Sequence, residues 1–195
     1  MAFNVTDFQQ QGLLYGGARP ALFQVDVTPP AALGLDLTSA RKFEFTCRAA
    51  NLPESNIDSI QIPYFGRKIK IAGDRTFPDW TVTIMNDEDF GVRAMFEKWS
   101  NSINRLRSNT RAAGLDLENY MADFTVTQFG KDGEIIRAYL IQSAFPTNVA
   151  AIDLDWDSTN AIETFNVTLA YTLWEPVVEI SSKIAGGINQ YAGDL

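Results

Sequence analysis

The sequence predicts a mainly β protein, an antiparallel β-sandwich or barrel with one flanking α-helix. About seven segments either alternate apolar with polar residues or are rich in β-branched residues, as strands are. A single segment shows the period of a helix, and the strands do not alternate with helices as they do in parallel α/β folds. The chain has 195 residues, 46 % of them hydrophobic, which suits one domain with a sizeable core.

Composition narrows the classes of function. The chain has no histidine, which removes the commonest general base and the commonest transition-metal ligand. Its one cysteine, Cys47, excludes disulfides within the chain and is interpreted as a small core residue. The net charge of −8 argues against a protein that binds nucleic acid tightly. Neither a membrane-spanning apolar stretch nor a signal peptide is visible, so we expect folding in a cytoplasm.

The N-terminal part of the chain is interpreted as an arm followed by a strand. Residues 1–40 carry scattered Gly and Pro, which favours loops or an extended arm over a packed helix. Residues 43–48 alternate strictly between apolar and polar types. This pattern predicts a half-buried strand with Phe43, Phe45 and Cys47 on one face.

The next segment combines loops and strands. Residues 51–63 are expected to form a loop with short extended pieces. Residues 67–71 alternate again and predict a strand, which a turn at Gly73-Asp74 would end. Residues 80–84 are rich in β-branched side chains and predict a further strand.

One helix is predicted over about residues 87–107. Asn86 is its expected N-cap, and Asp87 to Asp89 would fill the first turn, where the helix dipole favours negative charge. Arg105 and Arg107 lie at the opposite end, where positive charge is favoured. Apolar side chains recur at spacings of three, four and seven, which indicates one buried stripe. Its members are Val92, Met95, Phe96, Trp99, Ile103 and Leu106.

The C-terminal part returns to β-structure. Residues 123–129 and 134–141 are predicted strands, and the Gly- and Asp-containing link between them indicates a hairpin. Strand patterns follow at 149–156 and at 165–174, where Pro176 is expected to end the last strand. We therefore expect a single domain over 1–195. It would comprise an arm at 1–40, a β core at 43–176 and a tail at 177–195.

Acidic clusters were tested as metal sites. Asp153, Asp155 and Asp157 open like a calcium loop, but positions six and twelve hold Ser158 and Thr164 in place of Gly and Glu. We interpret these aspartates as the solvent-exposed face of a strand. Asp87 to Asp89 are explained by a helix start rather than by magnesium. We expect no catalytic, cofactor-binding or metal-binding residues. Two clusters stay open: Asp74, Arg75 and Asp79 as an acid/base site or a salt-bridged loop, and Arg105, Arg107 and Arg111 as an anion contact or a solvated helix end.

Two stretches carry a family resemblance. The first runs from Tyr64-Phe65-Gly66-Arg67 through the Gly-Asp-Arg-Thr-Phe-Pro-Asp-Trp run at residues 73–80 to Asn86-Asp87-Glu88-Asp89-Phe90. The second runs from Ala151 to Ser158 and resumes at Phe165-Asn166-Val167-Thr168, ending at Trp174-Glu175. Over residues 43–176 the chain resembles the tail tube protein of contractile-tailed bacteriophages.

The resemblance implies a structural subunit and no enzyme. Six β-sandwich subunits would form a ring, and rings would stack into a rigid tube inside a contractile sheath. The inner strands of a ring would join into one larger barrel around a channel for DNA and the tape-measure protein. The implied partners are copies of the chain, the tail sheath, tape-measure, baseplate and terminator proteins. The implied place is the virion tail, after assembly in the host cytoplasm.

Two sets of residues are expected to serve this assembly. Residues 51–79 are long for a connector, and long loops in compact domains are usually functional, so we expect them to contact a neighbouring subunit. The candidates there are Tyr64, Phe65, Arg67, Asp74, Arg75 and Asp79. A channel that passes DNA should repel phosphates, so we expect acidic side chains on alternating strand positions of its wall. The candidates are Asp123, Glu134, Asp153, Asp155 and Asp157.

Three alternatives remain open at this point. A baseplate tube-initiator protein would share the fold but form one ring. A tube protein of a type VI secretion system or bacteriocin-like particle would also share it. A monomeric β-barrel carrier or carboxylate enzyme would belong to another class, and particle size would separate it from the others.

Overall fold

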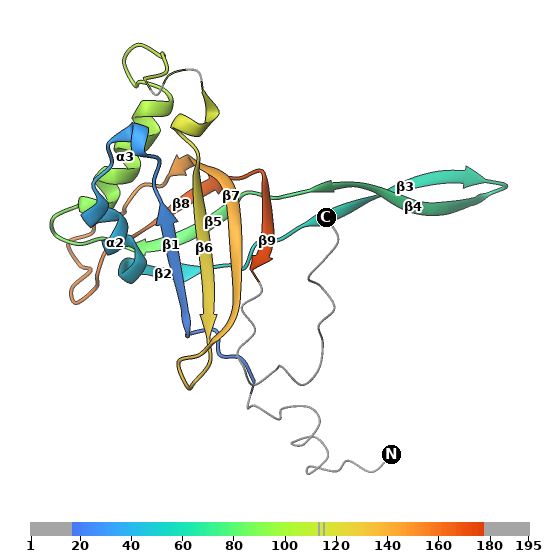
Figure 1. The fold of residues 1–195 in the computed structure, drawn as a ribbon, viewed down its shortest axis with the longest axis horizontal. Helices are drawn as coiled ribbons and strands as arrows, with labels where there is room; N and C mark the ends of the chain where they lie inside the picture. Colours follow the sequence, from blue (N-terminus) through green and yellow to red (C-terminus); the bar gives the residue numbers. More distant parts are fainter. Residues whose placement is uncertain (1–16, 113, 115, 178–195) are drawn as a thin grey trace, which may run out of the picture.

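The structure is a computed structural model that describes residues 17–112, 114 and 116–177. The predicted N-terminal arm before residue 17 and the tail from residue 178 lie outside the described residues. The elements, labelled as in Figure 1, include two short 3-10 turns, η2 (Ala31–Leu33) and η3 (Leu117–Asn119). The helices and strands are β1 (Phe23–Thr28), α2 (Leu37–Thr46), β2 (Cys47–Ala50), β3 (Asn56–Tyr64), β4 (Arg67–Thr76), β5 (Trp80–Met85), α3 (Gly91–Ile103), β6 (Ala122–Phe129), β7 (Ile135–Val149), β8 (Thr164–Ala170) and β9 (Leu173–Val177).

Two antiparallel layers share the long strand β7 (Figure 1). Its first part pairs with β6 on one side and β9 on the other, and β1 extends this layer beyond β6. Its last part, residues 145–149, pairs with β8, and β5 and β2 complete the second layer. The mainly β, antiparallel prediction is confirmed at this level, although the described strands do not close into a barrel.

β7 changes layer at a bulge. The register with β6 shifts between the pairs Ala122–Ala144 and Phe124–Ile141, which leaves one extra residue on β7. Ser143 lies there with a φ of 56°, and its backbone N–H donates to the Asp123 carboxylate at 2.9 Å. Bulges bend strands locally, so this one lets a single strand serve both layers.

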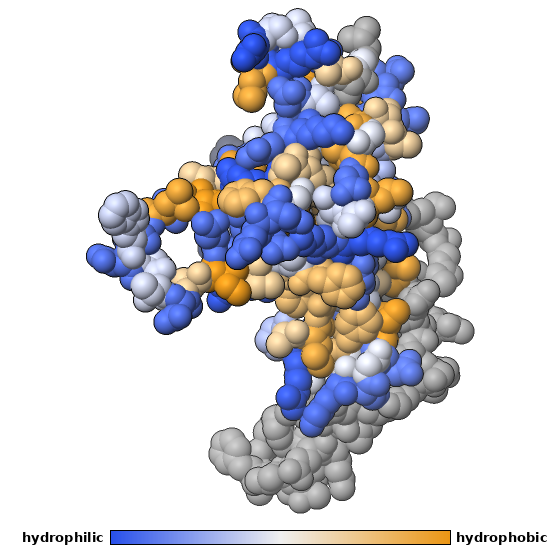
Figure 2. All heavy atoms as spheres, turned by 90° about the vertical axis from the view of Figure 1, so that its left-hand side faces the viewer, coloured by the Kyte–Doolittle hydropathy of each residue, from blue (hydrophilic) through white to orange (hydrophobic). Residues whose placement is uncertain are grey.

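The core lies between the two layers and is closed on one side by the helices. Phe124 of β6 stacks on Trp99 of α3, with ring centroids 6.2 Å apart, and meets Trp80 of β5 edge-on at 5.7 Å. Phe43 of α2 meets Phe96 of α3 edge-on at 5.7 Å. These aromatic side chains are all buried, so both helices belong to the same core as the sheets. Seen from the side of the helices, the outer surface carries both hydrophilic and hydrophobic side chains (Figure 2).

The strand predicted at 43–48 is wrong, because residues 37–46 form a second helix, α2. The Asp36 carboxylate caps it by accepting hydrogen bonds from the backbone of Thr38 and Ser39. Phe43 is fully buried while Phe45 is 77 % exposed, so the two side chains point to opposite sides, as they do on a helix and not on a strand. Cys47 begins β2 and packs against the core, as expected.

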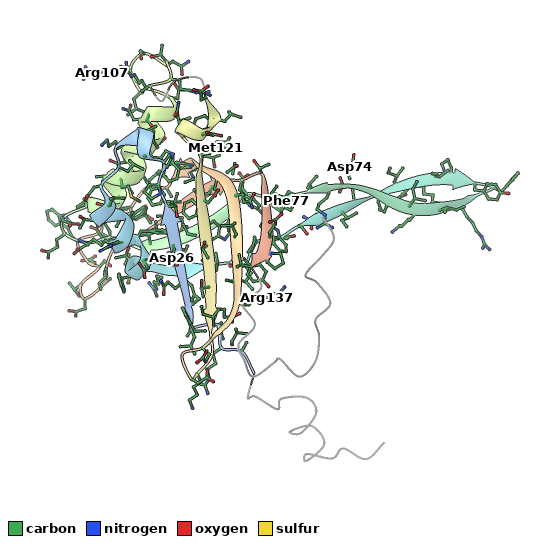
Figure 3. The ribbon with its side chains drawn as sticks, in the orientation of Figure 1. Asp26, Asp74, Phe77, Arg107, Met121 and Arg137 are labelled. Atoms are coloured by element: carbon green, nitrogen blue, oxygen red, sulfur yellow. The ribbon has the colours of Figure 1, made fainter. Side chains whose placement is uncertain are left out.

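The predicted helix at 87–107 exists but is shorter, and its caps differ. Phe90, in a left-handed conformation, precedes its first residue without a side-chain cap. Asp87 and Asp89 instead form ion pairs with Lys42 of α2, which joins the two helices. Asn86 donates to the Glu163 carboxylate at 3.0 Å. Arg105 and Arg107 lie beyond the end of the helix, and Arg107 is labelled in the loop that follows it in Figure 3.

Three further expectations fail. Residues 1–40 are not all arm and loops, because β1 forms the edge of the first layer. Residues 149–156 form a strand only at Val149, and the pattern at 165–174 divides into β8 and β9. Pro176 lies inside β9, and β9 is an edge strand, where sheets tolerate proline. Among the described residues, no helix is long and apolar enough to cross a membrane.

Candidate functional site

A two-stranded ribbon projects from the body of the protein (Figure 1). It consists of β3 and β4, which pair only with each other among the described strands. The register runs from Asn56 opposite Thr76 to Tyr64 opposite Arg67. At about 3.3 Å per residue, its nine-residue strand β3 spans about 30 Å. The predicted loop at 51–63 and turn at Gly73-Asp74 are therefore wrong, because both lie largely within this ribbon.

Gly73 serves the ribbon in another way. The register shifts between the pairs Ile57–Arg75 and Ser59–Ala72, which leaves one extra residue on β4, beside Gly73. A Cβ atom on Gly73 would lie 3.0 Å from the Asp58 carbonyl oxygen, which is closer than side chains ordinarily tolerate. Glycine therefore permits the close backbone approach at this bulge.

The ribbon has one apolar and one polar face. Cross-strand partners share a face, so Ile60, Ile62 and Tyr64 of β3 lie beside Ile71, Ile69 and Arg67 of β4. The four isoleucines are 45–53 % exposed. The opposite face carries Ser59, Gln61, Pro63, Lys68 and Lys70. An isolated hairpin is marginal in water, and a contiguous exposed apolar surface usually marks an interaction site.

The tip of the ribbon is aromatic. Phe65 and Gly66 form a two-residue turn in which both φ angles are positive, 40° and 81°. Such turns favour Asn-Gly, and a bulky residue at positive φ is strained. Phe65 nevertheless occupies this place with 92 % of its surface exposed, and its ring lies 4.7 Å from that of Tyr64. The tip thus presents two adjoining rings to its surroundings.

The root of the ribbon is held by the sheet. The Tyr171 hydroxyl and the Trp174 indole N–H both donate to the Glu54 carbonyl oxygen, at 3.0 and 3.2 Å. Phe77, at the root in Figure 3, packs on Tyr171 with ring centroids 5.9 Å apart. These contacts fix the direction in which the exposed faces point.

The predicted interface residues all lie on or beside this ribbon. Tyr64, Phe65 and Arg67 form the tip, and Asp74 and Arg75 lie on β4 nearer the root, while Asp79 follows β4. The ion pairs among the described residues include none of Asp74, Arg75 and Asp79, so the expected salt-bridged loop is wrong. The four isoleucines are not among the interface candidates predicted from the sequence, although their alternation with polar residues at 60–62 and 69–71 indicates an apolar strand face.

The predicted channel acids are scattered. Asp123 lies on the solvent side of β6 and binds the Ser143 N–H. Glu134 lies in the turn between β6 and β7. Asp153, Asp155 and Asp157 lie in the loop before β8, so their predicted strand is wrong, and Trp156 beside them is fully exposed. Within the part of the chain that the structure describes, no group of acidic or Cys side chains is placed to hold a metal ion.

The solvent-facing sides of both layers are free of cations at their centres. On the first layer, the outward positions include Asp26 of β1, Asp123 of β6 and Glu175 of β9. On the second layer, outward hydroxyls and amides pair across strands. Thr83 donates to Asn166 at 2.8 Å, and Thr81 and Thr168 lie 3.3 Å apart. Among the residues that the structure describes, neither face offers phosphates a row of Lys or Arg.

Comparisons with known proteins agree with this geometry. A family model described as phage tail tube protein matches residues 18–176. The tail tube protein gp19 of Enterobacteria phage T4 is 42 % identical over 159 residues, which is 81 % of this chain and 91 % of that protein.

Two solved structures show the same fold at low identity. A chain of the anti-feeding prophage baseplate superposes with a TM-score of 0.60 and 12 % identity, covering 83 % of this chain and 95 % of its own. A chain of the sheath–tube complex of the extracellular contractile injection system PVC superposes with a TM-score of 0.52 and 17 % identity, covering 90 % of this chain and 99 % of its own. From the family match and the identity to gp19, the chain belongs to the phage tail tube protein family and is a structural, non-enzymatic component of the virion tail of a contractile-tailed phage.

Proposed function

We propose that six copies of this chain form a ring, that rings stack into the inner tube of the tail, and that the tube conducts DNA. The observation that carries this proposal is the projecting β3–β4 ribbon, whose isoleucine face and aromatic tip are exposed in a single copy. A monomer would gain nothing from a 30 Å apolar arm, whereas a stacked assembly buries it against a neighbour.

Open sheet edges support joining within a ring. In the described part of the chain, β9 pairs only with β7, and β2 pairs only with β5. Each therefore has one backbone edge without a strand partner among the described residues, interrupted in β9 only at Pro176, and such an edge is a template for pairing with another chain. Six copies paired edge to edge would form the larger barrel around the channel.

The channel wall is proposed to be acidic or neutral. Six copies of net charge −8 carry −48 in all. Basic walls would neutralise phosphates and hold the DNA, whereas acidic and hydroxyl-bearing walls keep it mobile. Asp123, Glu134, Asp153, Asp155 and Asp157 remain candidates for this surface. A mainly positive channel, or tight and salt-sensitive binding of DNA by assembled tubes, would contradict the proposal.

The partners are proposed from the assemblies in which similar folds occur. Similar chains occur in a sheath–tube complex, a sheath/tube terminator and a baseplate. We extend these contacts to this chain: copies of itself, the tail sheath, the baseplate and the terminator. The tape-measure protein would occupy the channel before DNA does.

A baseplate initiator ring is the second candidate, because the anti-feeding prophage baseplate also contains this fold. Light scattering on the purified full chain separates the two. Particles that grow with concentration into long tubes support the tube subunit, and a single ring that does not grow supports the initiator. A strictly monomeric species at high concentration would contradict both.

A further inference from the structure

We propose that the aromatic tip of the ribbon of one copy docks into a groove between β1 and α2 of a second copy. The proposal rests on the proposed function, because it assumes that copies of the chain meet in an assembly. It adds the surface that receives the tip.

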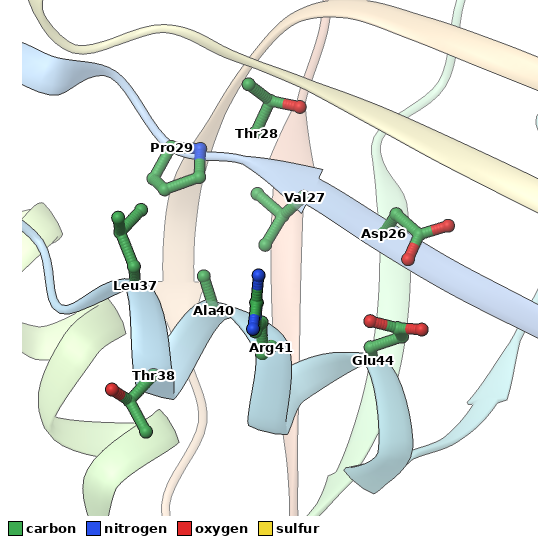
Figure 4. A pocket seen from close by; sticks show the side chains of 9 residues that line it. All are labelled: Asp26, Val27, Thr28, Pro29, Leu37, Thr38, Ala40, Arg41 and Glu44. Atoms are coloured by element: carbon green, nitrogen blue, oxygen red, sulfur yellow. The ribbon is translucent and has the colours of Figure 1, made fainter.

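The groove has the size and chemistry for such a guest (Figure 4). Its volume is about 460 Å³, within the range of ligand pockets. Leu37 and Pro29 lie at one end, Asp26 and Glu44 at the other, and Val27 and Ala40 lie between them. The remaining lining residues are Thr28, Thr38 and Arg41. Leu37 is 69 % exposed, so the apolar end is open to a partner.

The tip is built to fill a groove rather than to make an easy turn. Phe65 adopts a φ of 40° in a turn that Asn would form without strain, and Gly66 follows it at 81°. The Tyr64 and Phe65 rings meet edge-on at an interplanar angle of 82°, so the tip presents one joined aromatic surface. Rigid aromatic anchors in pockets supply most of the affinity at protein interfaces.

The ribbon tip and the groove carry charges of opposite sign that form no ion pairs among the described residues. Arg67, Lys68 and Lys70 flank the tip, and none is among the ion pairs of the described residues. In the groove, Asp26 and Glu44 both accept hydrogen bonds from the Gln24 amide, and neither has an ion-pair partner within the described ranges. Because Arg41 is the one cation in the lining, the groove keeps a net negative charge of one.

The contact would propagate. Tip and groove are different surfaces of the same chain, so each copy offers one of each. Contacts of this head-to-tail kind close into rings or continue as open stacks. A tube of stacked rings requires a contact that repeats in this way, with the tip of each copy bound in the groove of the next.

Cross-linking tests the contact directly. Pro63 immediately precedes Tyr64 on β3, so Pro63→Cys with Leu37→Cys places one thiol next to the tip, on the polar face of the ribbon, and one in the groove. Burial raises the pKa of the native Cys47 thiol to about 12, which slows its reaction with maleimides, and the wild type treated in the same way shows any background from Cys47. In assembled tubes of the full chain, a short bis-maleimide is expected to join these thiols into a ladder of covalent multimers.

The matched control moves the second thiol to the loop before β8, which carries Asp153, Asp155 and Asp157 and the fully exposed Trp156. Pro63→Cys with Trp156→Cys is expected to give no ladder. A ladder from the Trp156 pair, or intact tubes without a ladder from the Leu37 pair, would overturn the docking site while leaving tube formation standing. A wild-type chain that forms no assembly at all would instead contradict the proposed function itself.

A second variant keeps the β3–β4 hairpin but removes the exposed Phe65 ring from its tip. Phe65→Asn relieves the backbone at the turn, so the ribbon should form at least as well as in the wild type. We expect the concentration needed for assembly to rise about tenfold, the effect of losing one strong interface anchor. Unchanged assembly by Phe65→Asn would overturn the role of the tip.

Discussion

The Trp80 indole N–H donates a 2.7 Å hydrogen bond to the Asn51 carbonyl oxygen, and this bond ties together the two chain segments that flank the ribbon. Asn51 precedes β3 and Trp80 begins β5, so the bond closes the root of the ribbon. Trp80 is only 3 % exposed, and water has little access to replace the bond. The direction of a 30 Å arm therefore depends on a single buried donor together with the contacts to Glu54.

Trp80→Phe tests that dependence. The change leaves the Asn51 carbonyl without its donor, and we expect about 1–3 kcal/mol of lost unfolding free energy. Trp99→Phe is the matched control, because the buried Trp99 N–H donates at 2.7 Å to Tyr120, away from the ribbon. At similar thermal stability, Trp80→Phe should form fewer tubes by light scattering. Equal assembly by the two variants would show that the root bond does not orient the arm.

The isoleucine face can be tested apart from folding. Ile62→Thr with Ile69→Thr keeps β-branched residues in the strands but removes apolar surface that a single copy already exposes. Stability should change by no more than about 0.5 kcal/mol per site, whereas assembly should weaken strongly. Ser59→Thr with Gln61→Thr alters the opposite face as a control and leaves the charges beside the tip in place. Loss of thermal stability without loss of assembly would mean that the face packs within one copy.

Arg75→Glu tests the part of β4 nearer the root. Arg75 is exposed and lies opposite Ile57, so its replacement should hardly affect the melting temperature. We expect tube growth to weaken more than with Lys131→Glu, the same charge change in the turn between β6 and β7. If Arg75→Glu assembles normally while its melting temperature collapses, this region acts within the subunit.

The ion pairs between the helices predict a pH dependence of stability. Hydrogen bonds from Lys42 lower the pKa of Asp87 and of Asp89 below the ordinary 3.8, and the same contacts raise the pKa of Lys42 above 10.5. The ion pairs should therefore contribute fully to the free energy of unfolding between about pH 3.8 and pH 10.5, the ordinary pKa values of the two kinds of group. This contribution should fade as pH falls through the lowered carboxyl pKa values or rises through the raised ammonium pKa.

Lys42→Met removes these pairs and leaves the side-chain stem. Its melting temperature should lie below that of the wild type near neutral pH, and the difference should shrink in strong acid. Thermal unfolding followed across pH measures this difference. A gap that stays constant from neutral pH into strong acid would show that the loss comes from packing and not from charge.

Where the sequence predicted the fold correctly, local pattern and tertiary packing agree. Trp80–Met85 alternates buried and half-buried side chains as a strand in the sandwich should. The stripe from Val92 to Trp99 is buried as its period predicts. In both segments, the face that the pattern marks as apolar is the face that meets the core.

The failures have one physical cause, which is that alternation does not say what lies against the apolar face. Phe43 and Phe45 alternate, but the cap at Asp36 and packing on α3 favour a helix. Leu154 and Trp156 alternate too, yet both are exposed in a loop. The isoleucines of the ribbon lie on true strands, and their apolar face is about half exposed and covered by no other described element, so an intramolecular interpretation could not place them.

End-on electron micrographs of the purified full chain test the central claim most directly. The account predicts tubes of variable length built from stacked rings, with six-fold symmetry around an open channel. A population of monomers at high concentration, with no rings or tubes in the field, would contradict it.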